Sequence, residues 1–324
     1  MMETSRRRFL GAVAATAAAG SWPAQARAAA YPDKAVRVIV PFAAGGTTDM
    51  VARLTMQKLA EITGQSFVVD NKGGANGVIG TELAARAAPD GYTLLMNTAG
   101  AQTLSPVLYK TGYEALASFE PISHLCDVGF VVIARKDLPA ASLQELIAMA
   151  RQGQPLSASS GSSMIALITE QFKKVIGVPG IVNAQYKGTA PQMQAVVSGE
   201  VDFSFDSFVS VEMIRTGKVK ALAVLLPQRA EGFPQVPTAR EAGLEGMEFS
   251  SWSGLLAPRG TPREIVLQLV QHMDTVMQMP DVRARLQSYS YMPRRGTPEA
   301  FARLIESDHA RWKRIVKESG FQTE

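Results

Sequence analysis

The chain has 324 residues, an ordinary globular composition and a formal net charge of +4. Four arginines and one glutamate lie within residues 1–28, so the rest of the chain carries a net charge of only +1 and contains no block of lysines and arginines. This charge distribution argues against a nucleic-acid-binding protein, and the single cysteine, Cys126, excludes an internal disulfide.

Residues 1–28 have the features of an export signal. Three consecutive arginines precede Phe9 and Leu10, an alanine-rich apolar run follows, and small residues between Ala24 and Ala30 offer cleavage sites. The paired arginines before Phe-Leu indicate the twin-arginine type, and the apolar run is too short to span a membrane. The sequence therefore predicts a periplasmic protein from which this signal peptide is cleaved.

Residues 36–49 predict a strand, a tight loop and the start of a helix. A β-branched apolar run at 36–40 stops at Pro41, and a glycine pair then leads into a helix whose apolar residues share one face. Unpaired amides and the helix dipole at this N-terminus favour a carboxylate, with Thr47 and Thr48 as candidate caps. A plain strand-to-helix turn is the alternative, because neither a Walker nor a dinucleotide pattern is present.

The same pattern repeats after this helix. A strand at 66–69, a close-packed glycine-rich loop with a helix at 71–87 and a strand at 93–96 complete an alternating order. This order is typical of a parallel sheet with right-handed crossovers. Ligands bind beyond the carboxyl ends of such strands, where the loops 42–49 and 97–101 both lie.

A second group of strands and helices begins near residue 130, and Ser142 and Glu145 have the spacing of a capping box that opens a helix ending at Arg151. The strands of this group are followed by loops rich in small or hydroxyl side chains, at 159–163, 186–190 and 206–208. About 295 residues remain after the signal, which is more than one domain usually holds. We therefore expect two lobes whose loops face a cleft, with lobe 1 formed by 31–129 plus 251–324 and lobe 2 by 130–250.

Two amphipathic helices are expected at the end of the chain. Thr261 and Glu264 have the spacing of a capping box, with Pro262 as the first helical residue. Thr297 precedes the last helix, and the methionines and aromatic residues of both helices recur at the spacing of a buried face. We expect these side chains in the core.

No pattern of catalytic or metal-binding residues is present in the sequence. A hydrolase needs a nucleophile, a base and an orienting group, and no G-x-S-x-G surrounds the serines of 159–163. The histidines lack the pairing of a zinc site. Asp49 and Asp206 lie at the expected cleft, where capping is favoured over ligand contact for both. We expect no enzyme activity, no metal and no cofactor.

Several short motifs lie along the chain after the signal, in this order: Tyr31-Pro32-Asp33-Lys34, Val40-Pro41-Phe42-Ala43-Ala44-Gly45-Gly46 with Asp49, Ala88-Pro89-Asp90-Gly91-Tyr92, Tyr186-Lys187-Gly188, Gly199-Glu200-Val201-Asp202, Val236-Pro237-Thr238 with Glu241-Ala242-Gly243, and Pro280-Asp281-Val282-Arg283. Together they resemble the substrate-binding proteins of tripartite tricarboxylate transporters, also called the Bug family. The resemblance implies an α/β, two-lobed periplasmic binding protein of type II, a Venus flytrap in which each lobe is a mostly parallel sheet flanked by helices.

The resemblance also implies a receptor that closes on a small carboxylate and delivers it to membrane permease subunits. Similar proteins hold the carboxylate with backbone amides, hydroxyls and bridging water. Carried onto this chain, the contacts in lobe 1 would be Phe42, Ala43, Gly46, Thr47, Thr48, Asp49, Asn97, Thr98 and Ala99. The contacts in lobe 2 would be Ser160, Gly161, Ser162, Tyr186, Thr189, Ala190 and Asp206.

One departure from the family pattern affects the second lobe. The hydroxyl-rich loop is one residue shorter than is usual, and Ala166 stands where the family usually has a histidine. The sequence leaves the identity of the carboxylate open. We expect a monomer whose partners are a small carboxylate and the permease. A sensor subunit that presents a solute to a membrane kinase is an alternative, and a periplasmic serine hydrolase is a less favoured one.

Overall fold

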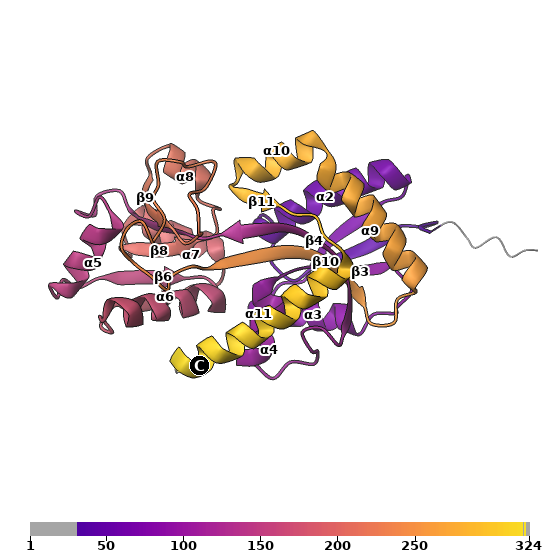
Figure 1. Cartoon of the computed structure of the whole chain (residues 1–324), viewed down its shortest axis with the longest axis horizontal. Coiled ribbons are helices and arrows are strands. Elements are labelled where there is room, and N and C mark those ends of the chain that lie inside the picture. Colours follow the sequence, from indigo (N-terminus) through magenta and orange to yellow (C-terminus); the bar gives the residue numbers. More distant parts are fainter. Residues whose placement is uncertain (1–30, 320, 322–324) are drawn as a thin grey trace, which may run out of the picture. The chain divides into compact units, whose positions relative to one another are not determined.

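The computed structural model describes residues 31–319 and 321 (Figure 1). The predicted signal peptide, residues 1–28, lies outside the described residues. The described residues from Lys34 onward form one compact unit, which contains two β-sheets. No helix among the described residues is long and apolar enough to cross a membrane.

The first sheet has six strands in the order β11-β4-β10-β3-β1-β2. Their bounds are β1 Val36–Val40, β2 Phe67–Asn71, β3 Thr93–Thr98, β4 Phe119–Gly129, β10 Ser250–Pro258 and β11 Tyr291–Pro293. Strand β1 pairs in parallel with β2 and β3. The three pairs that involve β10 or β11 are antiparallel.

The second sheet has five strands in the order β7-β6-β8-β5-β9. Their bounds are β5 Val131–Arg135, β6 Ser157–Ser160, β7 Val182–Gln185, β8 Phe203–Asp206 and β9 Val219–Val224. Strand β6 pairs in parallel with β7 and β8, whereas β5 pairs antiparallel with β8 and β9.

Both sheets are therefore mixed, although the sequence analysis expected mostly parallel sheets. The difference comes from the segments that join the sheets. Strand β4 is followed by β5 after the single residue Phe130, and β10 brings the chain back to pair along the whole length of β4. All strands of the second sheet lie between β4 and β10 in the sequence, so β10 carries the returning chain in the direction opposite to β4 and pairs with it antiparallel.

Helices cover the sheets, with bounds α2 Thr47–Thr63, η1 Ala75–Gly77, α3 Val78–Ala85, η2 Gly100–Leu104, α4 Ser105–Leu108, α5 Leu143–Arg151, α6 Ser163–Ile176, α7 Thr189–Ser198, α8 Val211–Arg215, α9 Arg263–Gln278, α10 Pro280–Ser288 and α11 Pro298–Ser319. Helices α2, α9 and α10 contact one another, and α11 contacts β4, η2 and α4 (Figure 1). Helices α6 and α7 both contact β6 and β8. The expected core positions Met273, Met277 and Trp312 are buried.

The predicted capping box of α9 is wrong. Pro262 is the residue before the helix and not its first residue, and no side chain caps the amides of the first turn. Thr261 Oγ1 instead donates to the carbonyl of Pro258 at 2.8 Å. The hydroxyl that matched the capping pattern is therefore used in the preceding turn. The cap of α5 does form, since Ser142 Oγ accepts from the Glu145 amide at 3.2 Å.

Candidate ligand-binding site

Asp49 shapes the loop between β1 and α2. Its carboxylate, with only 5% of the side chain exposed, accepts from the Gly45 amide at 2.9 Å, from Arg53 Nε at 3.0 Å and from Asn71 Nδ2 at 3.0 Å. Burial by itself would raise the pKa of Asp49, but these hydrogen bonds and the charge of Arg53 lower it below its ordinary value. Asn71 Nδ2 also donates to the Phe42 carbonyl at 3.1 Å. Asp49 and Asn71 therefore fix the backbone of this loop.

Helix α2 begins without a side-chain cap. Gly46 is its N-cap residue, and neither Thr47 nor Thr48 accepts a hydrogen bond from the first-turn amides. The prediction of a threonine cap is wrong because both threonines already lie inside the helix, whereas a capping residue has extended backbone angles outside it. The hydroxyl of Thr47 lies instead 3.4 Å from Ser207 Oγ. The first amides of α2 are left for another acceptor.

The glycine-rich loop at 71–80 packs closely, as the sequence analysis expected. Gly77 has a φ of 87°, and a Cβ at this position would lie 2.6 Å from the Ala101 Cβ and 3.2 Å from the Phe42 ring. Only glycine permits this approach. Gly77 therefore lies against both the ring of Phe42 and Ala101, which follows β3.

Two of the three predicted contacts at the end of β3 are fully buried. Asn97 is 0% exposed, and its Nδ2 donates to Gln102 Oε1 at 2.6 Å and to Thr81 Oγ1 at 3.2 Å. Its Oδ1 accepts from the Thr98 amide at 2.9 Å. Ala99 is also 0% exposed, whereas Thr98 is half-buried. The side chain of Asn97 therefore holds the loop in position, and Thr98 is the more accessible of the three.

Gln192, which the sequence analysis did not select, ties together the loops of the second sheet. Its side chain accepts from the Gly161 amide at 2.6 Å and donates to Ser204 Oγ at 2.8 Å and to the Phe205 carbonyl at 3.0 Å. The residue is 1% exposed. One glutamine in the first turn of α7 thereby joins the ends of β6 and β8.

The hydroxyls predicted as contacts in the second sheet already have partners there. Ser160 Oγ donates to Asn183 Oδ1 at 2.6 Å, and Ser162 Oγ accepts from the Ile165 amide at 3.4 Å as the cap of α6. The hydroxyl of Tyr186 donates to Glu200 Oε1 at 2.9 Å. These side chains therefore mainly stabilise the loops.

Helix α7, like α2, begins at a glycine and has no side-chain cap. Gly188 is its N-cap residue with a φ of 104°, and Thr189 and Ala190 form its first turn. A Cβ on Gly161 would overlap the backbone of Gly188, so the loop after β6 lies directly against the start of this helix. The predicted contacts Gly161, Thr189 and Ala190 are therefore brought together.

Asp206 is buried at the end of β8. Its Oδ2 accepts from the Ser210 amide at 3.0 Å and from Ser210 Oγ at 2.7 Å, and its Oδ1 has no hydrogen-bond partner among the described residues. Burial raises the pKa of this carboxyl above its ordinary value, and the hydrogen bonds only partly oppose this effect. Asp206 thus holds the turn before α8, as capping residues do. Its neighbour Ser207 faces Thr47, the first residue of α2 beside the first sheet.

Hydrogen bonds join loops beside the first sheet to loops beside the second at two places, and the helices add others, from Arg215 to the Ser288 carbonyl, from Gln287 to Glu231 and from Lys174 to the Glu318 carbonyl. At the first, Ser207 is held by Thr47 and by Tyr291, whose hydroxyl donates to the Ser207 carbonyl at 3.4 Å. At the second, Asn76 and Tyr109 from the first-sheet loops both bond to Ser163 at the start of α6. The sequence analysis missed Asn76, Tyr109 and Tyr291, since their roles depend on contacts between distant segments.

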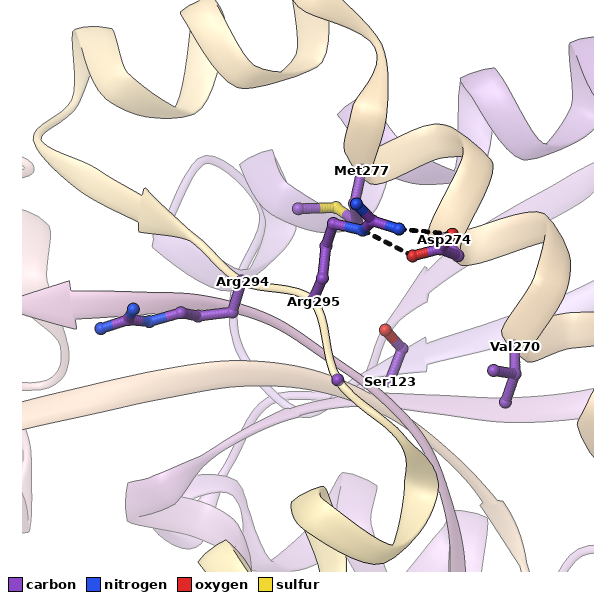
Figure 2. A pocket seen from close by; sticks show the side chains of 7 residues that line it. Ser123, Val270, Asp274, Met277, Arg294 and Arg295 are labelled. Carbon is purple, nitrogen blue, oxygen red and sulfur yellow. Dashed lines mark hydrogen bonds and ion pairs between the residues drawn. The ribbon is translucent and has the colours of Figure 1, made fainter.

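A shallow pocket elsewhere does not contain any of the predicted contacts (Figure 2). It is lined by Ser123, Val270, Asp274, Met277, Arg294, Arg295 and Gly296. Arg295 donates to both oxygens of Asp274, at 2.7 and 2.9 Å, so this pair neutralises its own charges. The loops described above, and not this pocket, combine uncapped helix N-termini with hydrogen bonds between the two sides.

Comparison with known proteins agrees with this arrangement. Residues 51–321 match the family described as the tripartite tricarboxylate transporter family receptor. The chain belongs to this receptor family. The match covers both sheets apart from β1 and the start of α2, so it applies to nearly all the described structure.

Solved structures of similar proteins cover from 88% to 91% of this chain. The periplasmic binding protein BugD is 35% identical, with a TM-score of 0.84 over 91% of this chain and 100% of BugD. MatC from Rhodopseudomonas palustris with bound malate is 34% identical, with a TM-score of 0.82 over 88% of this chain and 100% of MatC. Rpa4515 of R. palustris with adipate is 35% identical, with a TM-score of 0.85 over 90% of this chain and 98% of that protein.

These findings confirm the resemblance to the Bug family and the α/β fold class of a periplasmic binding protein. The receptor has two mixed sheets flanked by helices, as its solved relatives do. The family and its structural neighbours are solute-binding proteins and not enzymes, which removes the serine hydrolase alternative.

Proposed function

We propose that this receptor binds a small carboxylate between the loops of its two sheets and delivers it to the membrane permease subunits of a tripartite transporter. The observation that carries the proposal is the pair of helices that start at uncapped glycines, α2 beside the first sheet and α7 beside the second. Amides at helix N-termini favour an anion, and the dipole adds to this preference. Malate in MatC and adipate in Rpa4515 indicate the chemical class of the ligand.

We take the lobes of the proposed receptor to be 31–129 with 251–324 and 130–250, and the presence of two separate sheets supports this division. We assign the direct contacts to the amides and accessible hydroxyls of the predicted residues, above all Thr47, Thr48, Thr189 and Ala190. Asp49, Asn97 and Ser160 support them by holding the loops. Bridging water completes the contacts to the carboxylate. Residues 1–28 direct export, and the receptor acts as a periplasmic monomer.

Isothermal titration calorimetry tests this function directly. The protein without residues 1–28 is titrated with malate, adipate, citrate and benzoate, and with uncharged diols of matching length. We expect at least one acid to bind with micromolar affinity, about −8 kcal/mol, and the diols not to bind. Equal binding of acids and diols, or no binding of any acid in a broader panel, would overturn the proposal.

A further inference from the structure

We propose that Asn76, Tyr109 and Ser163 form a clasp between the loops of the two sheets, and that Asn76 sets the equilibrium between the open and closed receptor. The inference rests on the proposed function to the extent that closure is the step that traps the ligand. It adds three residues to the account of that step, and two of them, Asn76 and Tyr109, come from loops with no predicted ligand contact.

Three hydrogen bonds make up the clasp. Asn76 Oδ1 accepts from the Ser163 amide at 3.1 Å, Asn76 Nδ2 donates to the Tyr109 hydroxyl at 2.9 Å, and that hydroxyl lies 2.7 Å from Ser163 Oγ. Asn76 belongs to η1 and Tyr109 follows α4, both beside the first sheet, whereas Ser163 begins α6 beside the second. The side chains of Asn76, Tyr109 and Ser163, together with the Ser163 amide, therefore form a closed ring of hydrogen bonds between the two sides.

The clasp completes the N-terminus of α6. Ser162 caps only the Ile165 amide, and the Ser163 amide, which is also in the first turn, receives its acceptor from Asn76. An amide at this position has no partner within its own helix. Opening the receptor would remove Asn76 from Ser163 and leave this amide to solvent. Closure thus supplies a helix cap from the opposite loop.

The backbone of the loop is arranged to present Asn76. Its φ and ψ are 53° and 35°, in the left-handed region, where asparagine is among the few tolerated residues other than glycine. Ser105 Oγ donates to the Asn76 carbonyl at 3.2 Å and anchors the residue to its own side. Asn76 is exposed and is not part of the core. Its side chain is therefore free to act across the sheets without supporting either one.

A clasp of this kind affects every ligand by the same factor. It adds to the stability of the closed form, and apparent affinity scales with the fraction of receptor that can adopt this form. A residue that touched the ligand would instead distinguish short from long acids. If Asn76 competed with the ligand for the Ser163 amide, its removal would tighten binding. These three roles predict different results for one set of variants.

The test uses Asn76→Gly and Tyr109→Phe, with Tyr289→Phe as the matched control. Glycine has no steric cost at the φ of Asn76, and phenylalanine keeps the ring of Tyr109. The Tyr289 hydroxyl accepts from Arg285 at 3.0 Å within the first-sheet side, so its loss removes a hydrogen bond without breaking the clasp. Spin labels at the exposed residues Gln57 and Gln154 report the distance between the sheets by pulsed electron paramagnetic resonance.

Without ligand, we expect both clasp variants to shift the distance distribution towards the open form, lowering the closed-to-open ratio about five-fold, the size of a typical helix-cap effect. Apparent affinities for two acids of different length fall by the same factor. The control matches the wild type. Unchanged distances in both variants, or tighter binding by Asn76→Gly, would overturn the clasp. The distances are measured without ligand, so they test the clasp alone. A wild-type protein that binds no acid would instead refute the proposed function.

Discussion

The buried polar residues around the loops mainly stabilise the loops themselves. Asp49, Asn97 and Gln192 are almost fully buried, and each directs several hydrogen bonds to neighbouring loop backbone or side chains. The sequence pattern identified Asp49 and Asp206 as residues of the cleft edge and favoured a capping role for both. It could not identify Gln192, because an ordinary glutamine in a helix gives no signal until the strands that it joins are placed in space.

The two buried aspartates are expected to give opposite pH dependence. The pKa of Asp49 is lowered, so its contribution to stability is present above the ordinary value of 3.8 and is lost as pH falls through a lower folded-state value. The pKa of Asp206 is raised, so its contribution is present below 3.8 and is lost as pH rises through a higher value. Urea unfolding of Asp49→Asn and Asp206→Asn from pH 3 to 7 measures both effects.

Relative to Asp49→Asn, the wild type should be most stable at neutral pH and lose its advantage in acid. Relative to Asp206→Asn, the wild type should gain stability as the pH falls, since asparagine imitates the protonated carboxyl. The two difference curves therefore have slopes of opposite sign. Slopes of the same sign would contradict the explanation that hydrogen bonds lower the pKa of Asp49 while burial raises the pKa of Asp206.

Individual helices and strands could be predicted where the signal lies in residues that are neighbours in the sequence. The β-branched run at 36–40 and the glycine pair after it define β1 and the start of α2, and Ser142 caps α5 as its spacing indicates. The capping box predicted at Thr261 is wrong, because the Thr261 hydroxyl donates to the Pro258 carbonyl in the turn before the helix. The clasp at Asn76 could not be predicted, because its partner Ser163 lies 87 residues away and meets it only in the folded chain.

We propose that the first amides of α2 and α7 provide much of the affinity for the ligand. Thr189→Pro removes one such amide, while proline at the first helical position preserves the helix. We expect carboxylate affinity to fall about ten-fold, the loss of a hydrogen bond to a charged group, with little change in unfolding free energy. Calorimetry and urea unfolding measure the two quantities.

Arg263→Pro is the matched control for this change. It removes the first amide of α9, which has no role in the proposed site, and its preceding residue Pro262 already has the extended backbone that proline requires. Its affinity should equal that of the wild type. If both variants weaken binding equally, or if Thr189→Pro binds normally, the amides of α7 do not hold the ligand.

At the scale of the whole molecule, the alternating order of strands and helices was sufficient to predict an α/β fold with two groups of loops. The mixed pairing was not predictable, because it depends on how β4 and β10 pass from one sheet to the other. Strands β4 and β10 pair with each other, and we expect the hinge motion at the segments that connect them to the second sheet. Closure about them would bring α2 and α7 onto one ligand.

A crystal structure of the receptor grown with an acid that binds in the calorimetric titration tests the central claim most directly. We expect the acid between the two sheets, with carboxylate oxygens about 2.9 Å from the first-turn amide nitrogens of both α2 and α7 and with no covalent change to the acid. An acid bound elsewhere, such as in the pocket of Figure 2, or held only by side chains of one sheet, would contradict this proposal.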